Sequence, residues 1–147
     1  MKRRRKDNVI SFLESELREY RTAKIRVRQL KQEKQAMYHK SRPPSREPVR
    51  GSHPGDPTSA AAIRIINIDK NIREYETQIA KIEAGLEMCN FRERELIKNK
   101  YFTSYEPTHE QNMECLRYGN RNTYYNTRDE AFRKIARAYG IRGWDES

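Results

Sequence analysis

Apolar residues recur at alternating three- and four-residue spacings through the middle of the chain, which predicts a long helix over residues 60–89. Thr58 or Ser59 can serve as its N-cap. Polar residues fill the other positions, so the apolar stripe is a narrow heptad seam that another helix must cover. The seam consists of Ile65, Ile68, Ile72, Tyr75, Ile79, Ile82, Leu86 and Cys89.

A similar pattern predicts a first long helix over residues 7–40, with Asp7 or Asn8 as its N-cap. This helix could fold back onto residues 60–89 as an antiparallel hairpin, or a second copy of the chain could cover the seam. Both arrangements hold if two hairpins associate, so we expect a homo-oligomer, with a dimer favoured. The apolar positions drift around the helix, which indicates that it leans across its partner: Ile10, Leu13, Leu17, Tyr20, then Ala23, Val27, Leu30 and Met37.

Residues 41–59 contain five of the six prolines together with Gly51 and Gly55, a composition that interrupts helices and strands. We expect a flexible linker or a long surface loop there, with His53 in solvent. A Pro-rich ligand for a partner domain is an alternative interpretation.

Three shorter helices are predicted within residues 90–142. Asn90 can cap the first, 91–102, whose apolar face is Phe91, Leu96, Ile97, Tyr101 and Phe102. A short helix over 108–116, with Met113 and Leu116 facing inward, and a tight turn lead to a last helix over 121–139. The predicted fold is therefore all-α: a long helical hairpin or coiled coil followed by a C-terminal helix-turn-helix domain.

The last helix carries the candidate chemistry. Asn120 is its expected N-cap, with Asn122 and Thr123 as alternatives, and Gly140 its expected C-cap. Helical spacing turns Tyr124, Phe132 and Ile135 inward. Side chains suited to reading base edges in the DNA major groove face outward from the first two turns: Arg121, Asn122, Tyr125 and Asn126. Residues placed to hold phosphates or to brace the helix are Arg117, Thr123, Arg128, Arg133 and Lys134.

A polar helix face is usually just exposed to solvent, so the pattern alone is weak evidence for DNA binding. The positive charge of the chain strengthens this interpretation. The net charge of +10 predicts attraction to a polyanion. The segment from Arg117 to Arg142 contains seven Lys or Arg residues and only two acidic residues, Asp129 and Glu130. A basic arm over residues 1–6 could add phosphate contacts, or could be a solvated tail.

The sequence shows few residues suited to catalysis or metal binding. The three histidines lack carboxylate or cysteine neighbours at metal or nucleophile spacing, so we expect no enzyme, no cofactor and no metal site. Cys89 and Cys115 are expected to be reduced, partly buried thiols. No apolar run approaches the length of a membrane span, and we expect a cytoplasmic protein.

The segments FRERELIKNKYF (91–102) and NRNTYYNTRDEAFRKIARAYGI (120–141) resemble phage late-operon transcriptional regulators of the ArpU/RinA type. The C-terminal part of that family looks like region four of bacterial sigma factors, and a long heptad helix precedes it. The sequence departs from the family at THEQNMECLRYGN, which is more polar and about one residue longer, and at the Pro-rich insertion. The resemblance implies a transcriptional regulator of a phage operon, with activation as the favoured direction. It also implies host RNA polymerase as an expected partner.

Two functions compete with this hypothesis. A phage packaging component resembling a small terminase subunit would also combine helix-turn-helix and oligomerising helices, although usually in the opposite order. A coiled-coil adaptor could dock its basic C-terminal domain on RNA polymerase without binding DNA. The tail, residues 143–147, leaves Trp144 as either a plug on the core or an exposed anchor.

Overall fold

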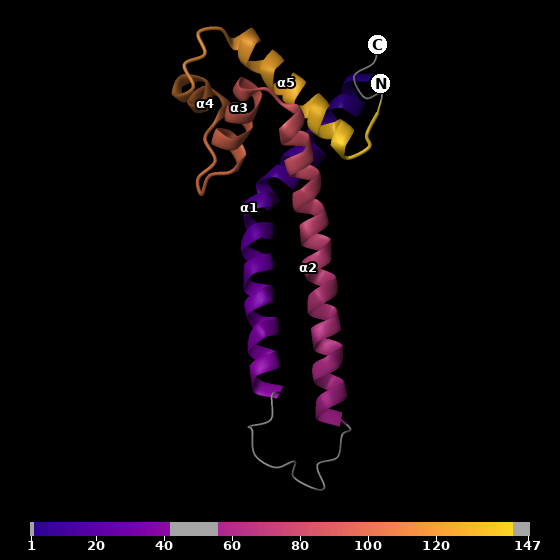
Figure 1. Cartoon of the computed structure of the whole chain (residues 1–147). Coiled ribbons are helices and arrows are strands. Elements are labelled where there is room, and N and C mark those ends of the chain that lie inside the picture. Colours follow the sequence, from indigo (N-terminus) through magenta and orange to yellow (C-terminus); the bar gives the residue numbers. More distant parts are fainter. Residues whose placement is uncertain (1, 42–55, 143–147) are drawn as a thin grey trace, which may run out of the picture. The chain divides into compact units, whose positions relative to one another are not determined.

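The computed structural model describes residues 2–142 except 42–55, and these residues form helices and no strands. The elements are α1 (Lys2–Ser41), α2 (Asp56–Met88), α3 (Phe91–Tyr101), α4 (His109–Cys115) and α5 (Arg121–Ala138) (Figure 1). The predicted all-α class is confirmed. The described residues divide into two compact units: a five-helix unit within residues 2–22 and 78–142, and a hairpin unit within residues 23–41 and 56–77.

Both long helices begin earlier than predicted. α1 begins at Lys2, so Asp7 and Asn8 lie inside the helix and a separate basic arm is wrong for residues 2–6. Lysine and arginine are good helix formers, and no Gly or Pro interrupts this stretch. α2 begins at Asp56 because Pro57 follows at a first-turn position, where its missing N–H is not needed. The rest of the expected linker, 42–55, and Trp144 lie outside the described residues.

In the hairpin unit, the predicted seams of both helices are turned inward. Ile68 and Ile72 of α2 are buried, and so are Ala23, Val27 and Leu30 of α1. Ion pairs between the two helices flank these seams: Lys31 with Glu76 at 3.1 Å, Lys34 with Asp69 at 2.6 Å, and Arg64 with Glu33 at 3.8 Å.

The fold-back arrangement therefore covers part of the seam within one chain: Ile68, Ile72, Ile82, Leu86 and Cys89 are buried, whereas Ile65, Tyr75 and Ile79 are half-buried. A homo-oligomer stays a prediction. The exposed faces of the same unit include Ile63 and Ile66, whose side chains are 59% and 61% exposed.

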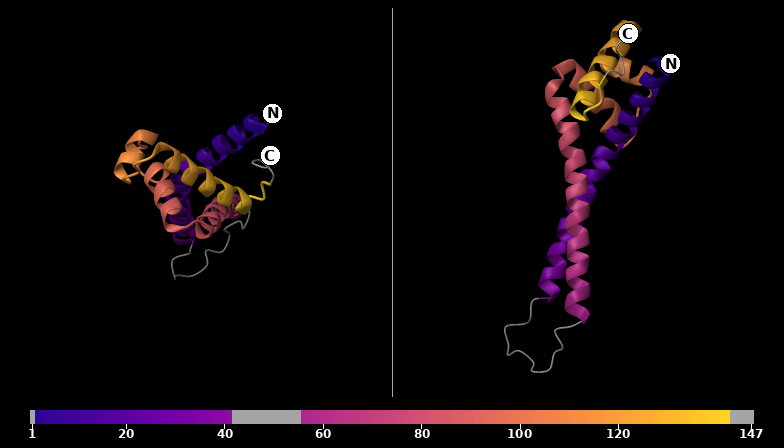
Figure 2. Two further views of the ribbon diagram at one scale, coloured as in Figure 1. Left: turned by 90° about the horizontal axis from the view of Figure 1, so that it is seen from above. Right: turned by 90° about the vertical axis from the view of Figure 1, so that its right-hand side faces the viewer.

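The five-helix unit has one continuous apolar core to which all five helices or their ends contribute. The seam reappears there in Leu13 and Leu17 of α1 and Ile82 and Leu86 of α2. α3 and α5 add the largest group of fully buried side chains: Leu96, Ile97, Tyr124, Phe132 and Ile135. Figure 2, seen from above, shows α5 crossing over the ends of the two long helices.

α3 begins where the sequence predicts. Asn90 is the N-cap, and a capping box forms because Asn90 Oδ1 accepts from the Glu93 N–H at 2.9 Å and the Glu93 carboxylate accepts from the Asn90 N–H at 2.7 Å. The predicted apolar face is correct for Leu96, Ile97 and Tyr101, which are buried. It is wrong for Phe91, which is 69% exposed. Phe91 is the first residue of the helix, and its side chain lines an open groove instead of the core.

A buried lysine fixes the loop between α3 and α4. Lys100 is 5% exposed, and its ammonium donates to the Glu106 carboxylate at 3.0 Å and to the Pro107 carbonyl at 2.6 Å. Arg18 of α1 donates to the same carboxylate at 2.6 Å, which holds the pKa of Glu106 below its ordinary value. These charge-assisted bonds tie the loop to α1 and set where α4 starts.

Gly85 of α2 allows α5 to approach closely. A Cβ at position 85 would lie 2.9 Å from Cα of Ile135 and 3.1 Å from its Cγ1. Because the nearer atom belongs to the backbone, a rotamer change cannot relieve that overlap. α2 and α5 can therefore keep this distance only with glycine at position 85.

Gly85→Val should lower the free energy of unfolding by about 1–3 kcal/mol, because the added side chain overpacks the α2–α5 contact. The measurement is urea unfolding followed by circular dichroism. Ala84→Val is the matched control, since Ala84 is an exposed neighbour on the same helix, and it should cost about 0.5 kcal/mol. Equal costs for the two variants would contradict the close approach.

Candidate nucleic-acid interface

The turn between α4 and α5, residues 116–120, sets the start of the candidate reading helix. Arg117 adopts φ 60°, and its neighbour Tyr118 donates its N–H back to the Met113 carbonyl at 2.8 Å. This closes α4 in the manner of a Schellman motif, with arginine at the left-handed position usually held by glycine. Gly119, which looks like the turn residue in the sequence, is not among the residues with positive φ.

α5 starts as predicted. Asn120 is the N-cap, and its side-chain oxygen accepts from the Asn122 N–H at 2.8 Å. The alternative caps, Asn122 and Thr123, both lie within the helix. Gly140 closes the far end with φ 76°, and the Ile141 N–H donates to the Ala136 carbonyl at 2.9 Å. The predicted N-cap is confirmed, whereas the C-cap is Tyr139, one residue before the predicted Gly140, which follows it in the left-handed conformation.

The inward face of α5 is also as predicted, and it holds a polar network that the sequence does not reveal. Tyr124 is fully buried, yet its hydroxyl bonds with Asn112 Nδ2 at 2.9 Å and with His109 Nδ1 at 2.9 Å. Asn112, itself fully buried, also donates to the Leu96 carbonyl at 3.3 Å and accepts from Asn99. α3, α4 and α5 are thus joined through one satisfied set of buried polar groups.

Three of the four predicted base-reading residues lie on open surface. Arg121, Asn122 and Asn126 are exposed. Tyr125 is half-buried: its ring packs edge-on to Tyr124 at 5.2 Å and lies 5.5 Å from His109. The guanidinium of Arg128 lies 4.9 Å from the centre of the ring. Tyr125 is therefore a rigid, partly covered platform, with less freedom than the sequence suggests.

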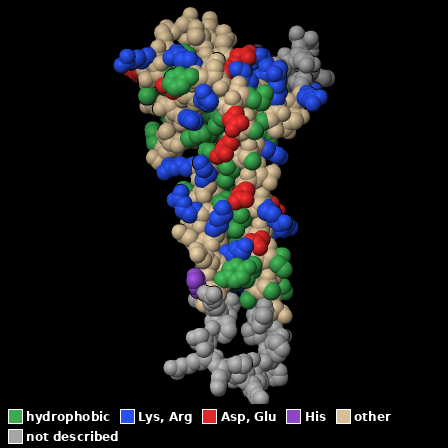
Figure 3. All heavy atoms as spheres, in the orientation of Figure 1, with side chains coloured by type: hydrophobic (Ala, Val, Ile, Leu, Met, Phe, Trp, Pro, Cys, Tyr) green, Lys and Arg blue, Asp and Glu red, His purple; other side chains and the backbone are tan. Residues whose placement is uncertain are grey.

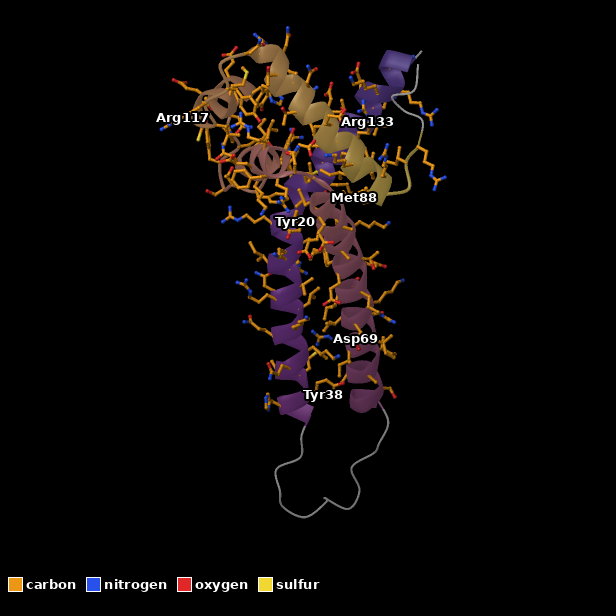
Figure 4. The ribbon with its side chains drawn as sticks, turned by 45° about the horizontal axis from the view of Figure 1, so that its top comes forward. Tyr20, Tyr38, Asp69, Met88, Arg117 and Arg133 are labelled. Atoms are coloured by element: carbon orange, nitrogen blue, oxygen red, sulfur yellow. The ribbon has the colours of Figure 1, made fainter. Side chains whose placement is uncertain are left out.

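The predicted phosphate-binding residues fall into two groups. Arg117 and Thr123 are exposed, without a carboxylate partner in the described part of the chain. The other three pair with carboxylates: Arg128 with Asp129 at 3.1 Å, Arg133 with Glu130, and Lys134 with Glu93 at 2.6 Å. Figure 4 labels Arg117 at the turn before α5 and Arg133 on its C-terminal half.

Lys134 acts as a brace. The Glu93 side chain is only 4% exposed, and Lys134 supplies the charge that compensates it. A buried carboxylate is stable only when it is paired and hydrogen-bonded, and Glu93 has both the Lys134 ammonium and the Asn90 N–H. Lys134 therefore serves the α3–α5 contact first.

The start of α1 joins this surface, which the sequence alone does not show. Lys6 Nζ lies 3.0 Å from the Asp129 carboxylate, and Arg5 Nη2 donates to the Arg142 carbonyl at 3.3 Å. Asp129 thereby has cations on two sides, Lys6 and Arg128.

The described residues contain no group of three or more His, Cys, Asp or Glu residues that could hold a metal ion. Cys89 is buried, with its thiol pKa raised to about 11 by burial, whereas Cys115 is exposed, contrary to the expectation of two partly buried thiols. None of the helices described here is both long and apolar enough to cross a bilayer.

Comparison with known proteins gives no match: neither a family model, nor a curated protein, nor a solved structure is similar to the chain. The resemblance to phage regulators therefore stays a prediction from the residues.

Acid should weaken the fold through His109. Burial, together with the nearby cations Lys100 and Arg128, lowers the pKa of His109 below its ordinary value of 6.5. The unfolded chain then binds a proton that the folded chain does not, so stability falls as pH drops below about 6.5. Unfolding by urea at about pH 7.5 and 5.5 measures this effect. His109→Gln, which can still accept from the Tyr124 hydroxyl, should show a smaller loss, and an unchanged loss would remove His109 from the cause.

Lys134→Met should lower the free energy of unfolding by about 3 kcal/mol, because it leaves the buried Glu93 carboxylate without its cation. The double variant Glu93→Gln/Lys134→Met should recover most of that loss, since no buried charge remains. Thermal and urea unfolding check both. If Lys134→Met were as stable as the parent chain and bound DNA less well, Lys134 would belong to the phosphate contacts instead.

Proposed function

We propose that the protein is a sequence-specific DNA-binding transcriptional regulator whose α4–turn–α5 segment is a helix-turn-helix. In this proposal α5 lies in the major groove of double-stranded DNA, and Arg121, Asn122 and Asn126 read base edges. Arginine can donate two bonds to guanine, and asparagine can bond adenine through both its amide and its carbonyl. Tyr125, held by its ring contacts, is placed to touch a thymine methyl or a sugar.

The observation that carries the proposal is the exposed line of amide side chains at the start of α5. Asn122 and Asn126 are one helical turn apart, so they project from the same face. Both are exposed, and neither serves as a helix cap, because Asn120 does so. The opposite face of α5 is fully occupied by the core. A helix buried on one side, with unused bidentate hydrogen-bonding groups on the other, is suited to groove reading.

The assignment to a phage operon, with activation as the favoured direction and the bacterial cytoplasm as the place, rests on the resemblance of residues 91–102 and 120–141 alone. RNA polymerase is an expected partner on the same grounds. A homodimer would suit a regulator, because dimers read two half-sites one helical turn apart.

An adaptor that docks on RNA polymerase is the second candidate, and one surface feature favours it. An open groove of about 740 Å³ lies along α3 and the end of α4. Its lining combines the exposed Phe91 and the half-buried Leu116 with Arg94 and Lys98, against Glu95 alone. Such a surface suits an acidic segment with an apolar anchor. Binding to polymerase with no measurable affinity for DNA would select this candidate.

The proposed function is tested by mixing the purified protein with sheared DNA from its source genome at about 150 mM salt and sequencing the retained fragments. This salt concentration suppresses the general attraction of a basic protein to any DNA. Enrichment of one short intergenic site is the expected result. Uniform retention would point to a packaging role, and no retention would point to a protein partner.

Asn126→Ala should weaken binding to the retained site by about 1–3 kcal/mol and leave binding to random duplex almost unchanged, because a base contact is lost and no phosphate contact is. Fluorescence anisotropy with the two duplexes measures both affinities. Asn71→Ala is the matched control, an exposed asparagine on α2, and should change neither. Equal losses on both duplexes would show that Asn126 is not a base reader.

A further inference from the structure

The first two turns of α1 contact α5 at its middle and the segment that follows it. Lys6 pairs with Asp129, and Arg5 donates to the Arg142 carbonyl. Further along, Phe12 of α1 packs edge-on against Tyr139 with ring centres 5.9 Å apart. The start of α1 is therefore a helical part of the same surface as α5.

The charges of this region are arranged unevenly. The acidic residues of α5, Asp129 and Glu130, are paired with Lys6, Arg128 and Arg133. Asp7 is the acidic residue on the first two turns of α1. Lys and Arg side chains gather where α1 and α5 meet (Figure 3). The exposed arginines here are Arg4, Arg5, Arg137 and Arg142.

The length of α5 separates this cluster from the base-reading end. α5 has 18 residues and is therefore about 27 Å long. Asn122 and Asn126 occupy its first two turns, whereas Arg137 and Arg142 lie at and beyond its last turn. In major-groove binding, the first turns of the reading helix meet the bases and its flanks meet the sugar–phosphate strands.

We propose that the first two turns of α1, with Arg4 and Arg5 as the contacting residues, form a second phosphate-binding element that grips the DNA backbone outside the groove read by α5. This inference rests on the proposed DNA-binding function and adds to it a fixed contact from the opposite end of the sequence. The ligand is the phosphate backbone of duplex DNA, whatever its base sequence. Guanidinium groups suit it because they bind phosphate through two parallel bonds.

Lys6 is a positioning residue in this arrangement. Its ammonium pairs with Asp129, which lies between the base-reading residues and the arginine cluster along α5. An uncompensated carboxylate there would repel the phosphates that the neighbouring arginines attract. Lys6 therefore both fixes α1 beside α5 and removes a negative charge from the DNA-facing surface.

The test compares two double variants of the full chain. Arg4→Gln/Arg5→Gln removes the proposed contacts, and Arg26→Gln/Arg28→Gln removes the same charge from exposed arginines of the hairpin unit on the same helix. Affinity for a specific and a random duplex is measured by anisotropy between about 50 and 200 mM salt. The first variant should lose on the order of tenfold affinity on both duplexes, and the slope of log K against log salt should fall by about two. The control should keep the parent slope.

Arg4→Lys/Arg5→Lys keeps the charge and should keep the slope, which separates a phosphate contact from damage to α1. Three results would overturn the inference while leaving the proposed function standing: an unchanged slope in Arg4→Gln/Arg5→Gln, an equal loss in the control, or a reduced slope in the lysine variant. A parent protein that binds no duplex would overturn the proposed function and this inference together.

Discussion

The buried stripe along α5 determines what the rest of the protein can present to a partner. Tyr124, Phe132 and Ile135 are fully buried, and the close approach to Gly85 leaves α5 no space to rotate. Tyr124 could not occupy the core without partners for its hydroxyl, and Asn112 and His109 provide them. Because one face of α5 is fixed in this way, the face with Asn122 and Asn126 must be the exposed one.

Ion pairs then divide the basic residues into two kinds. Lys134 compensates buried Glu93, Lys100 fixes the loop before α4, and Lys6 holds the start of α1. Their charges are already used within the fold. The arginines that remain on open surface, among them Arg117 and Arg137, are the ones that can serve a polyanion. Net charge alone would not make this distinction.

The sequence predicted most of the fold, because the heptad seam, the Asn90 and Asn120 N-caps and the glycine that ends α5 each depend on local spacing. It did not predict that α1 begins at Lys2 or that Lys6 meets Asp129, because that pairing joins residues from opposite ends of the chain. The sequence analysis gave Asn90 as the cap but neither the capping box with Glu93 nor the burial of Glu93. Asn112 carried no signal, since a polar residue in a short helix is usually solvated.

The central claim is that the first turns of α5 enter the major groove. The most direct measurement is a titration of the isotope-labelled full chain with the duplex recovered from its genome, followed by two-dimensional NMR. If α5 reads the groove, the largest shifts occur at the side-chain amides of Asn122 and Asn126 and at the backbone of residues 121–126. Shifts concentrated instead along the α3–α4 groove or in residues 23–77 would contradict it.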